Sequence, residues 1–313
     1  MKAFAIDLGG SHATLALMDG ETIVARELVE IVGDVPIGPE LPRIAKAVRG
    51  LADRAGVRLA DTAGIGWGFP ALVDGVNDRV MSTNKKYEDA ASVDFPAWAK
   101  QELGLRLKLE NDARMALLGE QASGAARGYG DVFLFTLGTG IGGVAMMEGK
   151  LVRGKHAQAG CLGGHVPVLF SGRACTCGSI GCAEAEAAGW SLPLVAKDWP
   201  GFAASALGKE PKVSFEALFR CARAGDSVSV ALRDRCIAVW AAAAVAAVHS
   251  FDPELVVYGG GVMAAADEIL PHIQRHLENH TWTPWGKVKV TAATLGNDAA
   301  LYGAIPMLRP EAS

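Results

Sequence analysis

Residues 4–20 read FAIDLGGSHATLALMDG, and residues 133–149 read FLFTLGTGIGGVAMMEG. The two stretches align without a gap: each has an apolar run, a glycine-rich turn, a second apolar run and an acidic residue followed by glycine. So much glycine would destabilise a helix of this length, whereas two strands joined by a tight turn accommodate it. The pattern predicts two β-hairpins, and their repetition predicts two similarly built domains.

The glycine-rich turns are candidate phosphate-binding loops. Backbone N–H groups in such turns can point together at an anion. The alternative is that both are ordinary hairpins in which the glycines serve only the turn. The matched pair, and the LGTGIGG run at 137–143 in the second copy, favour phosphate.

The rest of the chain alternates between strand and helix patterns, which indicates an α/β fold with parallel strand pairs. A buried helix is expected at 227–249 because that stretch is almost entirely apolar. The other expected elements are strands at 62–69, 105–109, 254–258 and 288–292, and helices at 111–125 and from about residue 298.

Length and composition restrict the function classes. A chain of 313 residues has room for two domains, and a net charge of −4 argues against a nucleic-acid partner. No apolar run is long enough to cross a membrane and no signal peptide is visible, so we expect no membrane partner and a cytoplasmic location. Thiols stay reduced in that compartment.

Two acidic residues lie at positions suited to phosphoryl transfer. Asp112 follows a predicted strand and begins a helix, where it could accept the proton of a hydroxyl that attacks a γ-phosphate. The alternative, that Asp112 only caps the helix, stays open. Asp7 ends the first strand beside the glycine turn and could hold Mg²⁺ through water, or could only stabilise the turn.

A cluster of sulfur ligands indicates zinc. Cys175, Cys177 and Cys182 lie within eight residues, and His165 precedes them. Three thiolates and one imidazole form a closed tetrahedral set, which is typical of structural zinc and leaves no open position for catalysis. The alternative is three unliganded thiols. Bound zinc would fix the loop that carries His165 and Glu184.

Seven segments together resemble the ROK family of sugar kinases, over essentially the whole chain. The cysteine segment is the most specific of them, because the hairpins alone indicate only the wider actin/hexokinase-like ATPase fold. The segments, in family order, are DLGGSHATLAL (7–17), GFPALVD (68–74), ENDARMALLGE (110–120), LGTGIGG (137–143), CTCGSIGCAE (175–184), YGGG (258–261) and LGNDAALYGA (295–304).

This resemblance implies two actin/hexokinase-like (ribonuclease H-like) α/β domains with an interdomain cleft that binds the sugar. We place the smaller domain at residues 1–111 and 297–313, and the larger domain, with the zinc loop, at 112–296. The implied activity is phosphorylation of a sugar hydroxyl by ATP and Mg²⁺, with a structural Zn²⁺, in a homodimer. Family repressors carry an N-terminal helix-turn-helix, for which the first strand, within five residues of Met1, leaves no room.

The resemblance also implies roles for single residues. Asp112 resembles the catalytic base, and Glu184 a sugar-binding carboxylate. The other implied sugar-binding residues are Asn111, His165, Pro70 and Asn84. The implied phosphate and nucleotide contacts, besides Asp7 for the metal, are Gly9, Gly10, Ser11, Thr136, Gly138, Thr139, Gly140, Gly260 and Gly261.

One sugar-reading group of the family pattern is missing. The family usually has a Glu before the zinc-binding His, and here that position is Cys161 or Leu162, depending on the alignment. A lesser departure is His12, where Lys is common. The sugar could therefore be another sugar or a polyol, or Glu186 could fill the gap; a non-catalytic sugar-binding protein is the remaining alternative.

Overall fold

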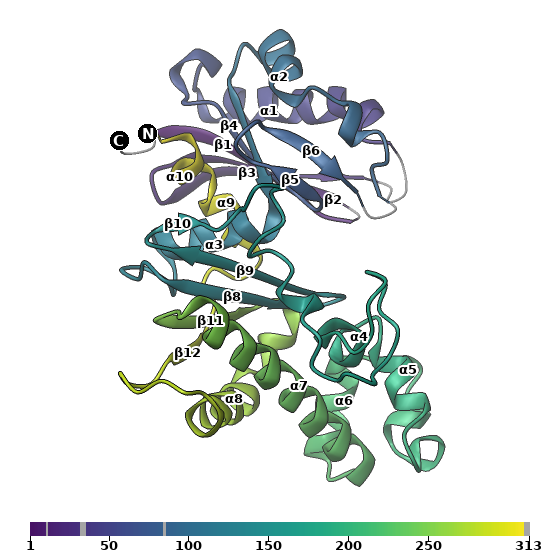
Figure 1. The fold of residues 1–313 in the computed structure, drawn as a ribbon. Coiled ribbons are helices and arrows are strands. Elements are labelled where there is room, and N and C mark those ends of the chain that lie inside the picture. The colour runs from purple at the N-terminus through teal and green to yellow at the C-terminus, as the bar shows by residue number, and fades with distance from the viewer. Residues whose placement is uncertain (11, 32–35, 84–85, 310–313) are drawn as a thin grey trace. The chain divides into compact units, whose positions relative to one another are not determined.

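The computed structural model describes residues 1–10, 12–31, 36–83 and 86–309. The chain forms two compact units (Figure 1). The first contains Met1–Gly128, Arg153–Ala159 and Thr294–Ser313, and the second contains Tyr129–Val152 and Gly160–Ala293. Our expected division, at 111/112 and 296/297, differs from this one because the helix after Asn111 and the short segment 153–159 both pack within the first unit.

Each unit is built on a five-stranded mixed sheet, and the two sheets have the same topology. The first has the order β3-β2-β1-β4-β7 and the second the order β10-β9-β8-β11-β12. In each, three strands form an antiparallel meander and two further strands pair in parallel beside its first strand. Both predicted hairpins are present, and the repeat in sequence is a repeat in topology.

The predicted elements of the first unit are present with ends that differ by a few residues, and the structure adds β3, β5, β6, α1 and α2, which the sequence analysis did not predict. Its strands are β1 (Lys2–Leu8), β2 (His12–Asp19), β3 (Thr22–Glu30), β4 (Ile65–Phe69), β7 (Leu107–Asn111) and the separate pair β5 (Leu72–Asp74) and β6 (Arg79–Ser82). Its helices are α1 (Leu41–Ala55), α2 (Phe95–Leu103), α3 (Asp112–Ser123), α9 (Ala299–Tyr302) and α10 (Ala304–Leu308).

The first sheet is covered on both faces. Successive side chains of a strand point to opposite faces, so Phe4 and Ile6 pack with α1 and α2, whereas Ala3 and Ala5 face α3, α9 and α10. The alanine face is flat and lets helices approach closely. A Cβ atom at Gly66 of β4 would lie 2.6 Å from the Cα atom of Ala304, so this position requires glycine.

The second unit packs its helices against the sheet through one large apolar core. Its strands are β8 (Val132–Leu137), β9 (Ile141–Met147), β10 (Lys150–Leu151), β11 (Leu255–Gly259) and β12 (Lys289–Ala292). Its helices are α4 (Ala183–Ala187), α5 (Leu192–Lys197), α6 (Phe215–Arg223), α7 (Ser227–Phe251) and α8 (Ala266–His280).

Helix α7 is less buried than its composition suggests. Leu232, Trp240 and Val248 lie in the core, but Ala238 is exposed. Alanine exposes little apolar surface, so an alanine-rich helix can keep one face in water. Among the described residues, no helix combines the length and the hydropathy needed to cross a membrane.

Candidate active-site groups

Asp112 lies at the junction of β7 and α3, as predicted, but it is not the cap of the helix. The cap is Asn111, whose side-chain oxygen accepts a hydrogen bond from the Arg114 N–H at 3.1 Å. Asn111 Nδ2 donates to the Ala71 carbonyl at 3.1 Å and to Asp112 Oδ1 at 2.9 Å. Asp112 Oδ1 also accepts from the Ala113 N–H at 2.8 Å. Because Asn111 caps the helix, capping does not account for a carboxylate at position 112.

Two carboxyl groups near this junction hold protons unusually tightly. Burial raises the pKa of Asp112 to about 6, although hydrogen bonds from Ala113 and Asn111 oppose the shift. Burial, followed by the charges of Asp112 and Asp298, raises the pKa of Asp7 to about 7. Asp298 itself pairs with Arg26 at 2.7 Å. Oxygen ligands crowded in this way suit a hard divalent cation such as Mg²⁺, whose charge would offset the repulsion.

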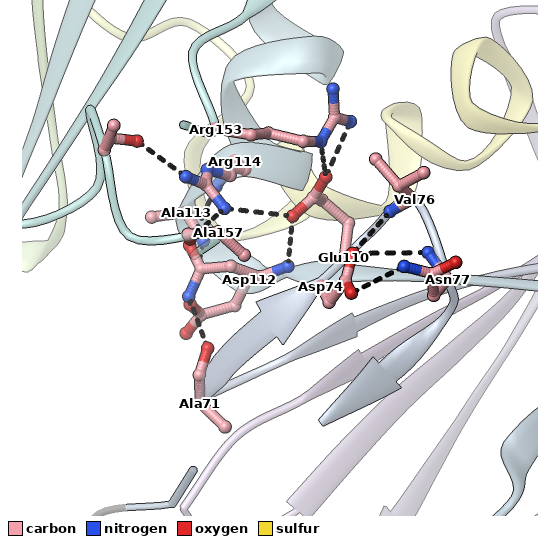
Figure 2. Close-up of polar contacts among 12 residues, drawn as sticks. Ala71, Asp74, Val76, Asn77, Glu110, Asp112, Ala113, Arg114, Arg153 and Ala157 are labelled. Atoms are coloured by element: carbon pink, nitrogen blue, oxygen red, sulfur yellow. Dashed lines mark hydrogen bonds and ion pairs between the residues drawn. The ribbon is translucent and has the colours of Figure 1, made fainter. Parts of the chain in front are cut away.

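A buried ionic network supports the same junction (Figure 2). Glu110, 1% exposed, accepts from Arg153 at 2.8 Å and lies 3.6 Å from the fully buried Arg114. Arg114 donates to the carbonyl oxygens of Ala157 at 3.0 Å and Ala159 at 2.7 Å. These bonds hold the segment 153–159 in the first unit, and they fix the start of α3 by interactions that are costly to break.

The first glycine turn is tight, and the ammonium group of a lysine from another segment lies against it. The Gly9 N–H donates to the His12 carbonyl at 2.8 Å, and the Tyr87 hydroxyl donates to the Gly9 carbonyl at 2.7 Å. A side chain at Gly10 would collide with Nζ of Lys86, so the lysine ammonium lies against the turn. Sequence analysis missed Lys86, which is distant in the chain.

Three other residues of the first unit were predicted to contact the sugar or the phosphates: Pro70, Ser11 and Asn84. Pro70 is half-buried directly after β4. Ser11 and Asn84 lie outside the described residues.

The four predicted zinc ligands converge. One ligand atom from each of His165, Cys175, Cys177 and Cys182 lies within 4.8 Å of the others. Sγ of Cys175 is 3.5 Å from Nδ1 of His165, and the Sγ atoms of Cys177 and Cys182 are 3.7 Å apart, far beyond a disulfide bond.

The electrostatics of these thiols also favour a cation. Burial and the two neighbouring cysteines raise the pKa of Cys182 to about 12, whereas the backbone N–H of Ser179 and the other thiols lower the pKa of Cys177. Three adjacent thiols cannot all ionise without a positive charge, so the donor set fits Zn²⁺.

Hydrogen bonds to the segment that follows the cysteines, residues 184–190, hold the second glycine turn in place. The N–H groups of Gly189 and Trp190 donate at 2.9 Å to the carbonyl oxygens of Gly138 and Thr139. Oε2 of Glu184 accepts from the Ile141 N–H at 2.9 Å. The predicted sugar-binding carboxylate therefore also supports the backbone of this turn.

This turn forms one side of a pocket of about 480 Å³ within the second unit. Of the predicted nucleotide contacts, Gly138, Thr139 and Gly261 line it. The other lining residues are Gly189, Trp190, Lys212, Val213, Ser214, Phe215, Glu216, Phe219, Arg223, Val262, Ala264 and Ala265. The size, apolar walls and charged rim suit a nucleotide base and sugar. No local motif singles out these residues, although Ser214, the cap of α6, is a recognisable helix start.

The remaining predicted residues of the second turn contribute in other ways. Thr136 lies at the end of β8, and a Cβ atom at Gly140 would lie 2.7 Å from Oε2 of Glu184. Gly260 has a φ of +90°, and a side chain there would collide with the Leu137 carbonyl. Gly260 therefore serves the backbone path, while Gly261 lines the pocket.

Glu186 does not replace the missing carboxylate. It is 2% exposed, pairs with Arg235 and accepts from the Arg173 N–H at 2.6 Å. Its charge is already neutralised within the unit. Leu162, by contrast, is 42% exposed, and Cys161 is half-buried.

Comparisons with known proteins agree with this geometry. The ROK family profile matches residues 3–311. A glucokinase of Thermotoga maritima is 29% identical over 99% of this chain and 98% of its own length. The crystal structure of a Thermus thermophilus ROK hexokinase is 30% identical, with a TM-score of 0.80, over 97% of this chain and 96% of that one.

A second solved relative was crystallised with ligands. A ROK family glucokinase from Streptomyces griseus, in complex with glucose and AMPPNP, is 30% identical with a TM-score of 0.76, over 97% of each chain. The α/β fold of two repeated sheets is thus that of ROK hexokinases. From the profile match across nearly all its residues, the chain belongs to the ROK family.

Proposed function

We propose that this protein is an ATP-dependent sugar kinase. The observation that carries the proposal is the Asp112 carboxylate: it is half-buried at the start of α3, is not needed as the cap, and has a pKa of about 6. A base with that pKa is ionised at neutral pH and still accepts a proton readily. Family membership and the similarity to glucokinases support the same activity.

In the proposed reaction a sugar hydroxyl donates its proton to Asp112. The hydroxyl oxygen forms a bond to the γ-phosphorus of ATP, the bond from that phosphorus to the bridging oxygen breaks, and ADP leaves with the electron pair. Asn111 orients the base through its bond to Oδ1, and the Glu110 network keeps the helix start in place. The base is thus positioned before the substrate binds.

The first glycine turn and its neighbours would carry the phosphate charge. Asp7 would hold Mg²⁺, which neutralises phosphate charge when bound. The backbone of Gly9 and Gly10 and the ammonium of Lys86 add donors on the same turn. In the second unit, Gly138, Thr139 and Gly261 would contact the nucleotide in the pocket they line.

The cysteine cluster would hold a structural Zn²⁺ through His165, Cys175, Cys177 and Cys182. The ion would stabilise the loop before α4, from which Glu184 would contact the sugar hydroxyls. Pro70, Asn84 and Asn111 remain proposed sugar contacts of the first unit.

The exposed Leu162 favours a substrate other than glucose, because an apolar side chain stands where the family has a carboxylate. A coupled ADP-release assay over aldoses, ketoses, amino sugars and polyols tests the function. Turnover of at least one sugar, abolished in Asp112→Asn, is expected. A well-folded protein that binds a sugar without turnover would support the non-catalytic alternative.

We also propose a homodimer in the cytoplasm. Thiols stay reduced in that compartment, so the cysteines proposed to hold zinc would remain available as ligands. Light scattering of the purified protein gives the mass directly, and a monomer at micromolar concentration would reject the dimer.

A further inference from the structure

Trp190 contacts the second glycine turn, Glu184 and the core around two of the cysteines. Its backbone N–H donates to the Thr139 carbonyl of the glycine turn at 2.9 Å. Its indole N–H donates to Oε1 of Glu184 at 3.3 Å. Its side chain packs against the cluster of Cys175, Cys182 and Ala185, and the residue is among those that line the 480 Å³ pocket.

Trp190 packs against the large apolar core, but its polar contact differs from that of a fully buried tryptophan. Trp240, 1% exposed, donates its indole N–H to the Ala187 carbonyl and packs within the large apolar core. Trp190 is only half-buried, and its indole N–H is bonded to a charged side chain instead of to backbone. The bond of Trp190 thus bears on the orientation of an ionisable side chain, whereas that of Trp240 bears only on the backbone.

The two oxygens of Glu184 are held by two different elements. Oε2 accepts from the Ile141 N–H of the glycine turn, and Oε1 accepts from Trp190. Removing the indole bond would leave the carboxylate anchored at one oxygen and free to rotate. The rotamer of Glu184 therefore depends on a residue that also lines the 480 Å³ pocket.

We propose that Trp190 is a positioning residue: its ring forms a wall of the nucleotide pocket, and its indole N–H sets the Glu184 carboxylate for the sugar. This inference rests on the proposed kinase function. It means that a nucleotide in the pocket steadies the sugar-binding carboxylate, so each substrate strengthens binding of the other, as linkage requires.

The test is Trp190→Phe, which keeps an aromatic ring and removes the N–H. The KM for sugar should rise about 3- to 10-fold, while kcat and the affinity for AMPPNP measured without sugar change less than about twofold. Trp199→Phe, a half-buried tryptophan of the same unit that lies outside the pocket lining, is the matched control and should change none of these. A purely structural defect would lower kcat by reducing the active fraction and leave KM unchanged.

A double-variant cycle tests whether Trp190 acts through Glu184. Trp190→Phe should lower kcat/KM for sugar much less in a Glu184→Ala background than in the wild type. An equal loss in both backgrounds would overturn the link between the two residues.

Binding of AMPPNP, followed by tryptophan fluorescence, gives a readout that does not need turnover. The signal should persist in Trp199→Phe and largely disappear in Trp190→Phe; a full signal in Trp190→Phe would overturn the pocket-wall role. If the wild type turns over no sugar but shows this signal, the kinase proposal fails and Trp190 is a nucleotide contact only. If it turns over sugar and Trp190→Phe leaves the KM for sugar unchanged, the positioning role alone fails.

Discussion

The two glycine turns come from matching stretches of sequence, yet their surroundings differ. In the gapless alignment Asp7 of the first turn corresponds to Thr136 of the second. Asp7 belongs to a group of half-buried carboxyls with Asp112 and Asp298. The second turn has no acid at this position and lines a pocket, where it is held by the segment from Glu184 to Trp190.

The difference shows that one backbone pattern serves two kinds of chemistry. The turn geometry supplies N–H groups in both places, but neighbouring side chains decide their use. Carboxyls with pKa values near 6 and 7 suit proton acceptance and metal binding, whereas an apolar pocket suits a nucleotide. The account therefore predicts that variants at the first turn change the rate of chemistry and that variants at the second change nucleotide affinity.

The largest effect is expected for Asp112→Asn. General-base assistance contributes about 10²- to 10⁴-fold, so kcat should fall at least about 100-fold because the amide cannot accept the proton. Steady-state kinetics at saturating ATP gives the value. The wild-type kcat should also fall as pH drops through about 6, where Asp112 becomes protonated.

Asp94→Asn is the control for that variant, since Asp94 caps α2 through the Ala97 N–H and has no proposed role in chemistry. It should leave kcat unchanged. An Asp112→Asn protein with more than about a tenth of wild-type kcat would show that Asp112 is not the base.

Because the family's first sugar-binding carboxylate is missing, we expect the wild type to bind glucose weakly and a variant with a Glu at that position to bind it better. A buried carboxylate bonded to a hydroxyl contributes ~1.5–3 kcal/mol. Glucose, if accepted, should bind at least about tenfold more weakly than to a relative with both carboxylates. Leu162→Glu should lower the KM for glucose about tenfold. Cys161→Glu tests the alternative alignment in the same way. Failure of both, or a sub-millimolar wild-type KM with no other sugar preferred, would argue that the lost carboxylate has been replaced.

Loss of the zinc ion should raise the KM for sugar more than the KM for ATP. Elemental analysis should find about one zinc per chain in the wild type and none in Cys177→Ser. The KM for sugar should rise several-fold, because the loop before Glu184 loses its anchor. Cys221→Ser, outside the cluster, should retain the metal. A fully active wild-type preparation without metal would contradict the structural-zinc assignment.

The smallest effect concerns stability. The pKa of Asp7 is about 7 in the folded protein against an ordinary value of 3.8. The unfolded chain therefore loses this proton first, and the folded state loses relative stability as pH rises from about 4 to 7. Asp7→Asn cannot ionise, so its Tm should exceed that of the wild type by a few degrees at pH 8, measured without nucleotide or Mg²⁺. The difference should shrink toward pH 4 and on adding Mg²⁺; a pH-independent difference would contradict the raised pKa.

Much of this fold was predictable because its signals are local. Glycine hairpins, the long apolar helix and the closely spaced cysteines each lie within one stretch of chain. The structure confirmed both hairpins and brought the four zinc ligands together.

Long-range contacts were not predictable in the same way. The segment 153–159 belongs to the first unit because Arg114 binds the carbonyls of Ala157 and Ala159. The pocket wall at Trp190 and the cation at Lys86 likewise depend on tertiary packing.

Strand register was also hidden from sequence. The gapless alignment suggests identical turns, but Leu8 pairs with Ala13 whereas Leu137 pairs with Ile141. Four residues thus separate the last pair of the first hairpin, and three separate that of the second. Hairpin register follows turn geometry, which glycine-rich sequences specify weakly.

Calorimetric titration of AMPPNP into two variants tests the central distinction most directly. Gly138→Ala adds a methyl group to the pocket wall, with no atom of the surrounding protein within 4 Å of it, so the fold should tolerate it. Gly138→Ala should weaken nucleotide binding by about tenfold, and Asp112→Asn should change it by less than about threefold, despite its loss of kcat. Equal weakening in both variants, or unchanged affinity in Gly138→Ala, would contradict the separate roles of the two turns.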